Sequence, residues 1–311
     1  MKDLYLYIGR YATKPILDNL GFRRREDNIT NWPRICWIST GTLSLYPVGL
    51  SGFGLRQRGS AFNRVISTYA PSVKSLLVAR IRSSIMPAHS TVDKDPSVAI
   101  FAMKTTKGSV KQDPYQHDED KPEARSWGKF KLAEDENRIV QDYLPAVEVK
   151  IQPTGLEVIN TLRKCFSIVH FSCHGWTDYI KPAESMLLFD DWGTDPLAVE
   201  KIVRASIGSK LAVVSACSTA NSGLEGLQDE PNHVTAALFT AGFQTVVGTL
   251  WSVVEDQALI FTKEFYQILA LHAKDGITTR VVAEAVHLAT MKVAESRPNP
   301  AVWSPFICFG V

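Results

Sequence analysis

The sequence of 311 residues lacks the features that identify several large classes of protein. It has only five cysteines, and their odd number and wide spacing do not fit a disulfide framework. No CxxC or HExxH pattern occurs, so we expect neither a metal site nor a cofactor. The five cysteines are Cys36, Cys165, Cys173, Cys217 and Cys308.

Long apolar segments are also missing. The longest apolar stretch lies around Val246–Val254, and it is far too short to span a bilayer. The N-terminus, MKDLYLYIGRYATK, interrupts its apolar residues with charges and lacks the apolar region of a signal peptide. We therefore expect a cytoplasmic protein with no membrane partner.

No charge of one sign dominates the chain. The 34 Lys and Arg residues nearly balance the 32 Asp and Glu residues, which leaves a formal net charge of +2. Because no basic stripe with interleaved aromatic residues occurs, we expect no nucleic-acid partner. Hydrophobic residues make up 45% of the chain, enough for the core of one large unit or two subdomains.

The pattern of residues 1–92 predicts a smaller N-terminal α/β subdomain. Residues Lys14–Gly21 have helical spacing and end at a glycine that suits a helix terminus. Residues Arg34–Thr40 form a β-rich run. Residues 61–82 begin like a strand and end like a helix, which Pro71 is placed to start.

Residues 93–311 predict an α/β core with one insertion. A buried strand at 97–103 precedes a stretch at 104–132 that is rich in Lys, Asp, Glu and Pro, and this composition predicts a flexible, exposed insertion. Apolar runs of strand length then alternate with amphipathic stretches of helix length, which implies a mostly parallel sheet with helices on both faces. The predicted strands are Ala146–Ile151, Phe166–Ser172, Ser185–Asp190, Leu211–Ala216, Thr245–Leu250 and Trp303–Phe309. The predicted helices are 133–143, Thr154–Leu162, Leu197–Ala205, His233–Ala241, Glu255–Leu271 and Thr278–Val293.

Two predicted strands lead into residues suited to nucleophilic catalysis. His174 and Gly175 follow one strand, and Cys217 follows the other. Because open α/β sheets bind ligands beyond the carboxyl ends of their strands, both side chains would face one cleft if the strands are neighbours. A cysteine protease needs this pair, since the imidazole takes the thiol proton and then protonates the leaving amine. The N–H groups of Gly175 and Cys217 could hold the oxyanion.

Core packing is the alternative role for these residues. A cysteine at the end of a buried strand commonly packs in the core, so the pattern leaves both roles open for Cys217. His170 and Cys173 are expected to be core residues, with the imidazole hydrogen-bonded. A serine hydrolase would need a G-x-S-x-G elbow, which the sequence lacks.

The segments around both strand ends carry longer motifs. VHFSCHG at 169–175, followed by LAVVSACSTA at 211–220, resembles the CHAT family of caspase-like cysteine peptidases. The resemblance continues through residues 229–258, and more loosely through 31–52 and 66–80, where it is to fungal and actinobacterial members. The histidine of the family's L-P-x-H-A-A-G segment is absent here, as are the tetratricopeptide repeats to which many members are attached.

This resemblance implies a caspase-like fold and a regulated cysteine endopeptidase that cleaves protein or peptide substrates. It implies His174 as general base and acid, Cys217 as nucleophile and Gly175 as oxyanion donor. A tetratricopeptide-repeat protein or another regulatory partner is the implied regulator. The alternative is a catalytically silent CHAT interaction module in a signalling assembly, which would have no reason to keep both residues of the dyad.

Acidic residues in the loops after these strands bear on substrate choice. Asp178, Asp229, Glu230 and Asp256 are the candidates for an acidic S1 pocket, because clan relatives choose substrates by charge there. Such a pocket would favour Arg or Lys at P1. Capping of the helix that begins near Pro231 is the alternative role for Asp229 and Glu230.

Overall fold

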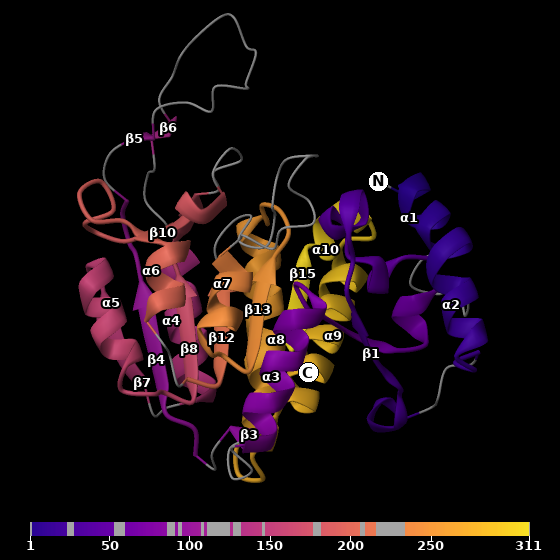
Figure 1. Cartoon of the computed structure of the whole chain (residues 1–311). Helices are drawn as coiled ribbons and strands as arrows, with labels where there is room; N and C mark the ends of the chain where they lie inside the picture. Colours follow the sequence, from indigo (N-terminus) through magenta and orange to yellow (C-terminus); the bar gives the residue numbers. More distant parts are fainter. Residues whose placement is uncertain are drawn as a thin grey trace, which may run out of the picture.

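An eight-stranded sheet organises the chain in the computed structural model (Figure 1). The structure describes residues 2–23, 28–52, 60–85, 91–92, 95–106, 109–110, 125–126, 132–144, 147–176, 182–205, 209–215 and 234–310. The strand order is β1-β2-β15-β13-β12-β8-β4-β7. The strands are β1 (Arg34–Trp37), β2 (Ile66–Tyr69), β4 (Val98–Ala102), β7 (Val147–Ile151), β8 (Ile168–Ser172), β12 (Leu211–Ser215), β13 (Thr245–Thr249) and β15 (Phe306–Gly310).

The sheet is mostly parallel, as the alternating pattern predicts. Five strands, from β13 through β12, β8 and β4 to β7, pair in parallel. On the other side, β15, β2 and β1 also pair in parallel, and the antiparallel pair β13–β15 joins the two groups. The carboxyl ends of β8 and β12 therefore lie side by side in the middle of one sheet edge.

Helices cover both faces of this sheet (Figure 1). One face packs against α4 (Leu132–Tyr143), α8 (Glu255–His272) and α9 (Thr279–Ser296). The other packs against α5 (Gly155–Leu162), α6 (Val199–Arg204) and α7 (Val234–Ala241). Successive strand residues alternate between the faces, so Val213 joins the first core and Val214 the second. Burial on both faces explains why these strands are continuous apolar runs.

Local signals define several helix ends where the sequence predicts them. Thr154 and Glu157 form the predicted capping box of α5, in which each side chain bonds the other residue's backbone N–H. Gly21 follows α2 (Lys14–Asn19) with φ +82°, a conformation that suits glycine. Gly242, with φ +132°, follows α7 in the same way.

The N-terminal block adds to the main sheet through β1 and β2. Before these strands lie α1 (Lys2–Ile8), a π-helical turn (Gly9–Thr13) and α2, and α3 (Val73–Ile85) follows them. Trp32 packs edge-on against His287 of α9, and Phe62 stacks on Trp303 of α10 (Pro300–Trp303). The division into 1–92 and 93–311 stays a prediction.

Short 3₁₀ helices cover Ile29–Asn31, Gly41–Leu45, Val48–Leu50, Ala61–Asn63 and Pro182–Glu184.

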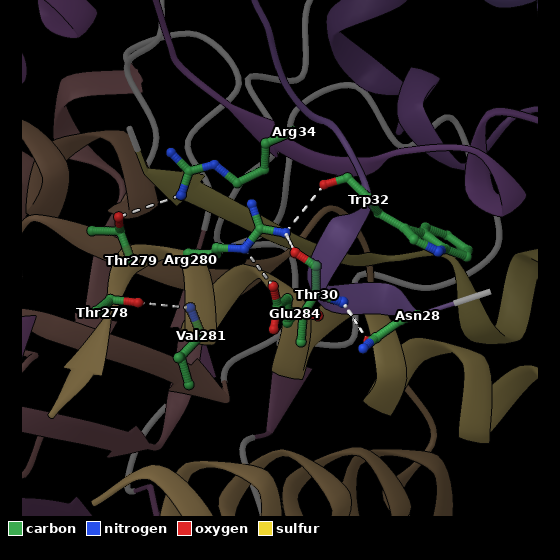
Figure 2. A network of polar contacts seen from close by, with 9 residues as sticks. All are labelled: Asn28, Thr30, Trp32, Arg34, Thr278, Thr279, Arg280, Val281 and Glu284. Carbon is green, nitrogen blue, oxygen red and sulfur yellow. Dashed lines mark hydrogen bonds and ion pairs between the residues drawn. The ribbon is translucent and has the colours of Figure 1, made fainter. Parts of the chain in front are cut away.

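Polar contacts fasten the same N-terminal segment to α9 (Figure 2). The Arg280 guanidinium donates to the carbonyl oxygens of Thr30 and Trp32 and to the Glu284 carboxylate, at 2.5, 3.1 and 2.7 Å. Figure 2 also shows Arg34 bonded to Thr279. The entry into β1 is therefore held by the amino-terminal turns of α9.

Smaller sheets complete the described part of the chain. A three-stranded antiparallel sheet joins β9 (His174–Trp176), β10 (Met186–Leu188) and β11 (Leu197–Ala198), and β10 confirms the predicted strand at Ser185–Asp190. β3 (Thr91–Val92) pairs with β14 (Ile277–Thr278). In the charged segment 104–132, β5 (Ser109–Val110) and β6 (Arg125–Ser126) pair over two residues, which the composition does not predict. Residues 107–108, 111–124 and 127–131 lie outside the described part. No described helix combines the length and apolarity needed to cross a membrane.

Candidate active site

The ends of β8 and β12 form the centre of the site. These strands are parallel neighbours, and Ser172 and Ser215, the last residue of each, are partners in the ladder. The adjacency on which the predicted dyad depends is thereby confirmed. His174 comes two residues after Ser172, and Cys217 comes two residues after Ser215 in the sequence. Cys217 itself lies outside the described residues.

His174 opens β9 directly after the chain bends at Cys173. Its side chain is half-buried and lines a pocket at the sheet edge. Burial lowers the pKa of the His174 imidazole, because removal from water disfavours the charged form. A neutral imidazole at neutral pH is the form that can accept a thiol proton.

Gly175, the predicted oxyanion donor, is buried in β9 beside His174. It lies opposite Leu187 of β10, while His174 lies opposite Leu188. The antiparallel pairing of β9 with β10 thus fixes the backbone of both residues with respect to the neighbouring strand. A glycine here leaves room for another backbone to approach.

A pocket of about 200 Å³ opens beside His174, at the carboxyl ends of β12 and β13 and against α8. Most of its lining is apolar, as in sites that bury a ligand side chain. Its polar lining residues are His174, Ser215, Thr249, Glu255 and Thr262, and its apolar ones are Leu132, Val213, Val214, Val247, Gly248, Val253, Ala258, Phe261 and Phe306.

Glu255 is an acidic lining residue that is not among the S1 candidates predicted from the sequence. Its neighbour Asp256, the predicted S1 candidate, is exposed in the first turn of α8 and is not part of the pocket lining. Both acids begin the same helix, where negative charge is favourable, so sequence position alone does not separate them. Asp178, Asp229 and Glu230 lie outside the described residues.

A fully buried polar cluster lies behind the pocket. Glu136 of α4 and His170 of β8 are both 0% exposed and 3.5 Å apart. His170 Nδ1 is 2.9 Å from the hydroxyl of Tyr266, which confirms the predicted hydrogen-bonded core role of His170. Cys173 is buried in the core, also as predicted. Glu136 was missed because the charged residues around it predict a surface helix.

Comparison with protein-family models decides the family of the chain. The CHAT domain model matches residues 10–311, which is nearly the whole sequence. This chain belongs to the CHAT domain family. No curated protein sequence matches this CHAT domain.

Among the described residues, no group of three or more His, Cys, Asp or Glu side chains is arranged to hold a metal ion.

Solved structures resemble this CHAT domain in fold. The Arg-specific cysteine proteinase gingipain R matches with a TM-score of 0.58 and 14% identity over 97% of the CHAT chain and 66% of its own. The complex of RgpB pro- and mature domains from Porphyromonas gingivalis matches with a TM-score of 0.57 and 13% identity. The match covers 97% of the CHAT chain and 68% of the matched chain. The Saccharomyces cerevisiae separase–securin complex matches with a TM-score of 0.52 and 14% identity. This match covers 79% of the CHAT chain and only 14% of the matched chain.

These likenesses show the fold class. The CHAT domain has a caspase-like architecture, a mostly parallel sheet flanked by helices. The chain spans about two thirds of the gingipain chains and a small part of the separase chain. Family and fold together support the cysteine-peptidase type.

Proposed function

We propose that this CHAT domain is a cysteine endopeptidase that cleaves protein substrates with a dyad of His174 and Cys217. One observation carries the proposal. β8 and β12 are adjacent and parallel, and their last residues, Ser172 and Ser215, are ladder partners. The two dyad residues follow these partners at equal distance in the sequence.

The chemistry assigns a role to each group at the sheet edge. The His174 imidazole takes the proton of the Cys217 thiol, and the thiolate sulfur attacks the carbonyl carbon of the scissile peptide bond. His174 then gives this proton to the leaving amine as the C–N bond breaks. Water, activated by the same imidazole, hydrolyses the thioester and releases the acid. The N–H groups of Gly175 and Cys217 hold the oxyanion in both steps.

The pocket beside His174 is the proposed S1 site. Its apolar walls suit the stem of a long side chain, and Glu255 supplies an acid for the cationic end of Arg or Lys. Asp178, Asp229, Glu230 and Asp256 remain candidates for further acidic contacts. The Arg specificity named for gingipain R agrees with a basic P1 residue.

Regulation by another protein segment belongs to the same proposal. The solved relatives include a complex of pro- and mature domains and a separase–securin complex. A tetratricopeptide-repeat protein, or another regulatory partner, is the class of regulator proposed for this CHAT domain.

Two substitutions test the dyad. We expect Cys217→Ser and His174→Ala to abolish cleavage of a fluorogenic tetrapeptide library scanned at P1, with the melting temperature nearly unchanged. Cys165→Ala is the matched control, because Cys165 is exposed and precedes the opposite end of β8. It should cleave at the wild-type rate and share the wild-type preference for Arg or Lys at P1.

Other results would favour other roles. A loss of several kcal/mol of stability in Cys217→Ser would assign this cysteine to core packing. If a thiol-directed probe labels the folded protein equally well after Cys217→Ala, the nucleophile assignment is wrong. Wild-type protein that cleaves no member of the library would favour the silent interaction module.

A further inference from the structure

Helix α4 carries a carboxylate into the apolar core behind the dyad strands. Glu136 lies on the same buried side of α4 as Ala133 and Val140, and its side chain is 0% exposed. A buried carboxylate is unfavourable unless hydrogen bonds replace its water. An apolar residue would fill this position without that requirement, so the partners of Glu136 indicate what the carboxylate does.

The partners of Glu136 come from three different elements. Its Oε2 accepts a hydrogen bond of 2.5 Å from Ser172 of β8 and lies 3.5 Å from His170 Nε2. Its Oε1 accepts bonds of 2.6 Å from Ser215 of β12 and 3.0 Å from Thr262 of α8. An ionised carboxylate has acceptor sites for all four contacts. One oxygen therefore holds β8, and the other holds β12 and α8.

The two serines lie at a particular place in the sheet. Ser172 and Ser215 are ladder partners and the last residues of their strands. His174 and Cys217 each follow two residues later. The carboxylate thus bridges the two strands at this ladder pair, two residues before each dyad residue in the sequence.

Tyr266 hydrogen-bonds to the other ring nitrogen of His170 and takes no part in the serine contacts of Glu136. Burial, with a further effect of the Glu136 charge, raises the pKa of Tyr266 well above its ordinary value, so the phenol keeps its proton. It can donate to His170 Nδ1, 2.9 Å away, which leaves the Nε2 proton of His170 directed at Glu136. The Tyr266 hydroxyl thus lies against His170 in the middle of β8.

We propose that Glu136 is a positioning residue for the dyad. Its carboxylate fixes the separation and direction of the β8 and β12 ends, and through them the approach of the His174 imidazole to the Cys217 sulfur. This inference rests on the proposed cysteine-peptidase function. Because Glu136 is not among the residues that line the pocket, its loss should affect the chemical step more than substrate binding.

Three variants separate positioning from simple stability. Glu136→Gln keeps the size of the side chain but replaces one carboxylate oxygen by an NH₂ donor. Ser172→Ala removes only the hydrogen bond from the Ser172 hydroxyl of β8 to Glu136. Tyr266→Phe is the matched control, because it removes a buried hydrogen bond of the same cluster. It leaves the hydrogen bonds from Ser172 and Ser215 to Glu136 intact. Activity is measured with the fluorogenic tetrapeptide that the P1 scan identifies, at a temperature where every variant is folded by circular dichroism.

Two quantities are compared for each variant. We expect Glu136→Gln and Ser172→Ala to lower kcat by about 10- to 100-fold with KM changed by less than about threefold. The rate at which iodoacetamide alkylates Cys217, read by mass spectrometry of the peptide, should fall in parallel. Tyr266→Phe should keep kcat and the alkylation rate within about twofold of wild type.

The outcomes distinguish the two proposals. If kcat falls no further in Glu136→Gln and Ser172→Ala than in Tyr266→Phe, the positioning role is wrong and the proposed function stands. If Cys217→Ala cleaves like the wild type, both proposals fall. Should Glu136→Gln not fold, Ser172→Ala compared with Tyr266→Phe decides the question, since each removes one hydroxyl group only.

Discussion

At the scale of single residues, the environment of His174 sets the expected pH dependence of cleavage. Its half-buried imidazole has a pKa below the ordinary value of 6.5, because burial disfavours the cation. Protonated His174 cannot accept the Cys217 proton, so activity should be lost as pH falls through this lowered pKa. We expect the acidic limb of kcat/KM to have its midpoint below pH 6.5. A pH series with the best tetrapeptide checks this, and a midpoint above 6.5 would contradict it.

Residues of the site differ in how well the sequence predicts them. His170 lies on the apolar strand β8 and His174 follows its end, and the direction and burial of this strand are readable from its residues. The core role of His170 and the place of His174 at the sheet edge could therefore be predicted. Glu136 lies among other charges in a helix with a surface-like composition, and its burial depends on serines of β8 and β12. A local pattern contains no information about such partners.

At the scale of elements, the contact between the N-terminal segment and α9 makes a testable prediction. Arg280 donates to two carbonyl oxygens near β1 and to the Glu284 carboxylate at once (Figure 2). Lysine keeps the charge but lacks the planar fork that reaches several acceptors. In Arg280→Lys we expect the amides at 32–37 to exchange hydrogen about tenfold faster, because one or two hydrogen bonds are lost.

Hydrogen exchange with mass spectrometry measures this effect by segment. Peptides from β8 and β12 serve as internal controls, since they lie in the middle of the sheet. Lys292→Ala is the matched variant, because Lys292 pairs with Glu295 on the exposed side of the same helix. If both variants change exchange at 32–37 equally, the Arg280 contacts do not hold the segment.

At the scale of the whole molecule, the sheet crosses the predicted boundary between 1–92 and 93–311. β2 pairs with β15, and β1 pairs with β2, so the first block covers an edge of the core. A truncated chain of residues 93–311 would expose β15 as an edge strand and uncover the aromatic surface around Trp303. We expect this chain to self-associate and to lose the cooperative melting of the full chain.

Sedimentation velocity and thermal unfolding by circular dichroism test this expectation. The full chain under the same conditions is the reference. A monomeric 93–311 chain with a cooperative transition would contradict it, and would show instead that residues 1–92 form a subdomain that the core does not need.

The sequence by itself determined the fold class, most of the main-sheet strands and their covering helices, and the two strand ends that carry the proposed dyad. These depend on apolar runs, on local caps such as Thr154 with Glu157, and on motifs that are contiguous in the chain. The sequence placed Leu197 in a helix and Trp303 in a strand, whereas the structure has them in β11 and α10. Only the tertiary structure decided that β8 and β12 are neighbours, that Glu255 lines the pocket and that Glu136 bridges two strands. The physical reason is distance along the chain. A buried carboxylate is stabilised by hydroxyl groups 36 and 79 residues away, and folding alone brings them together.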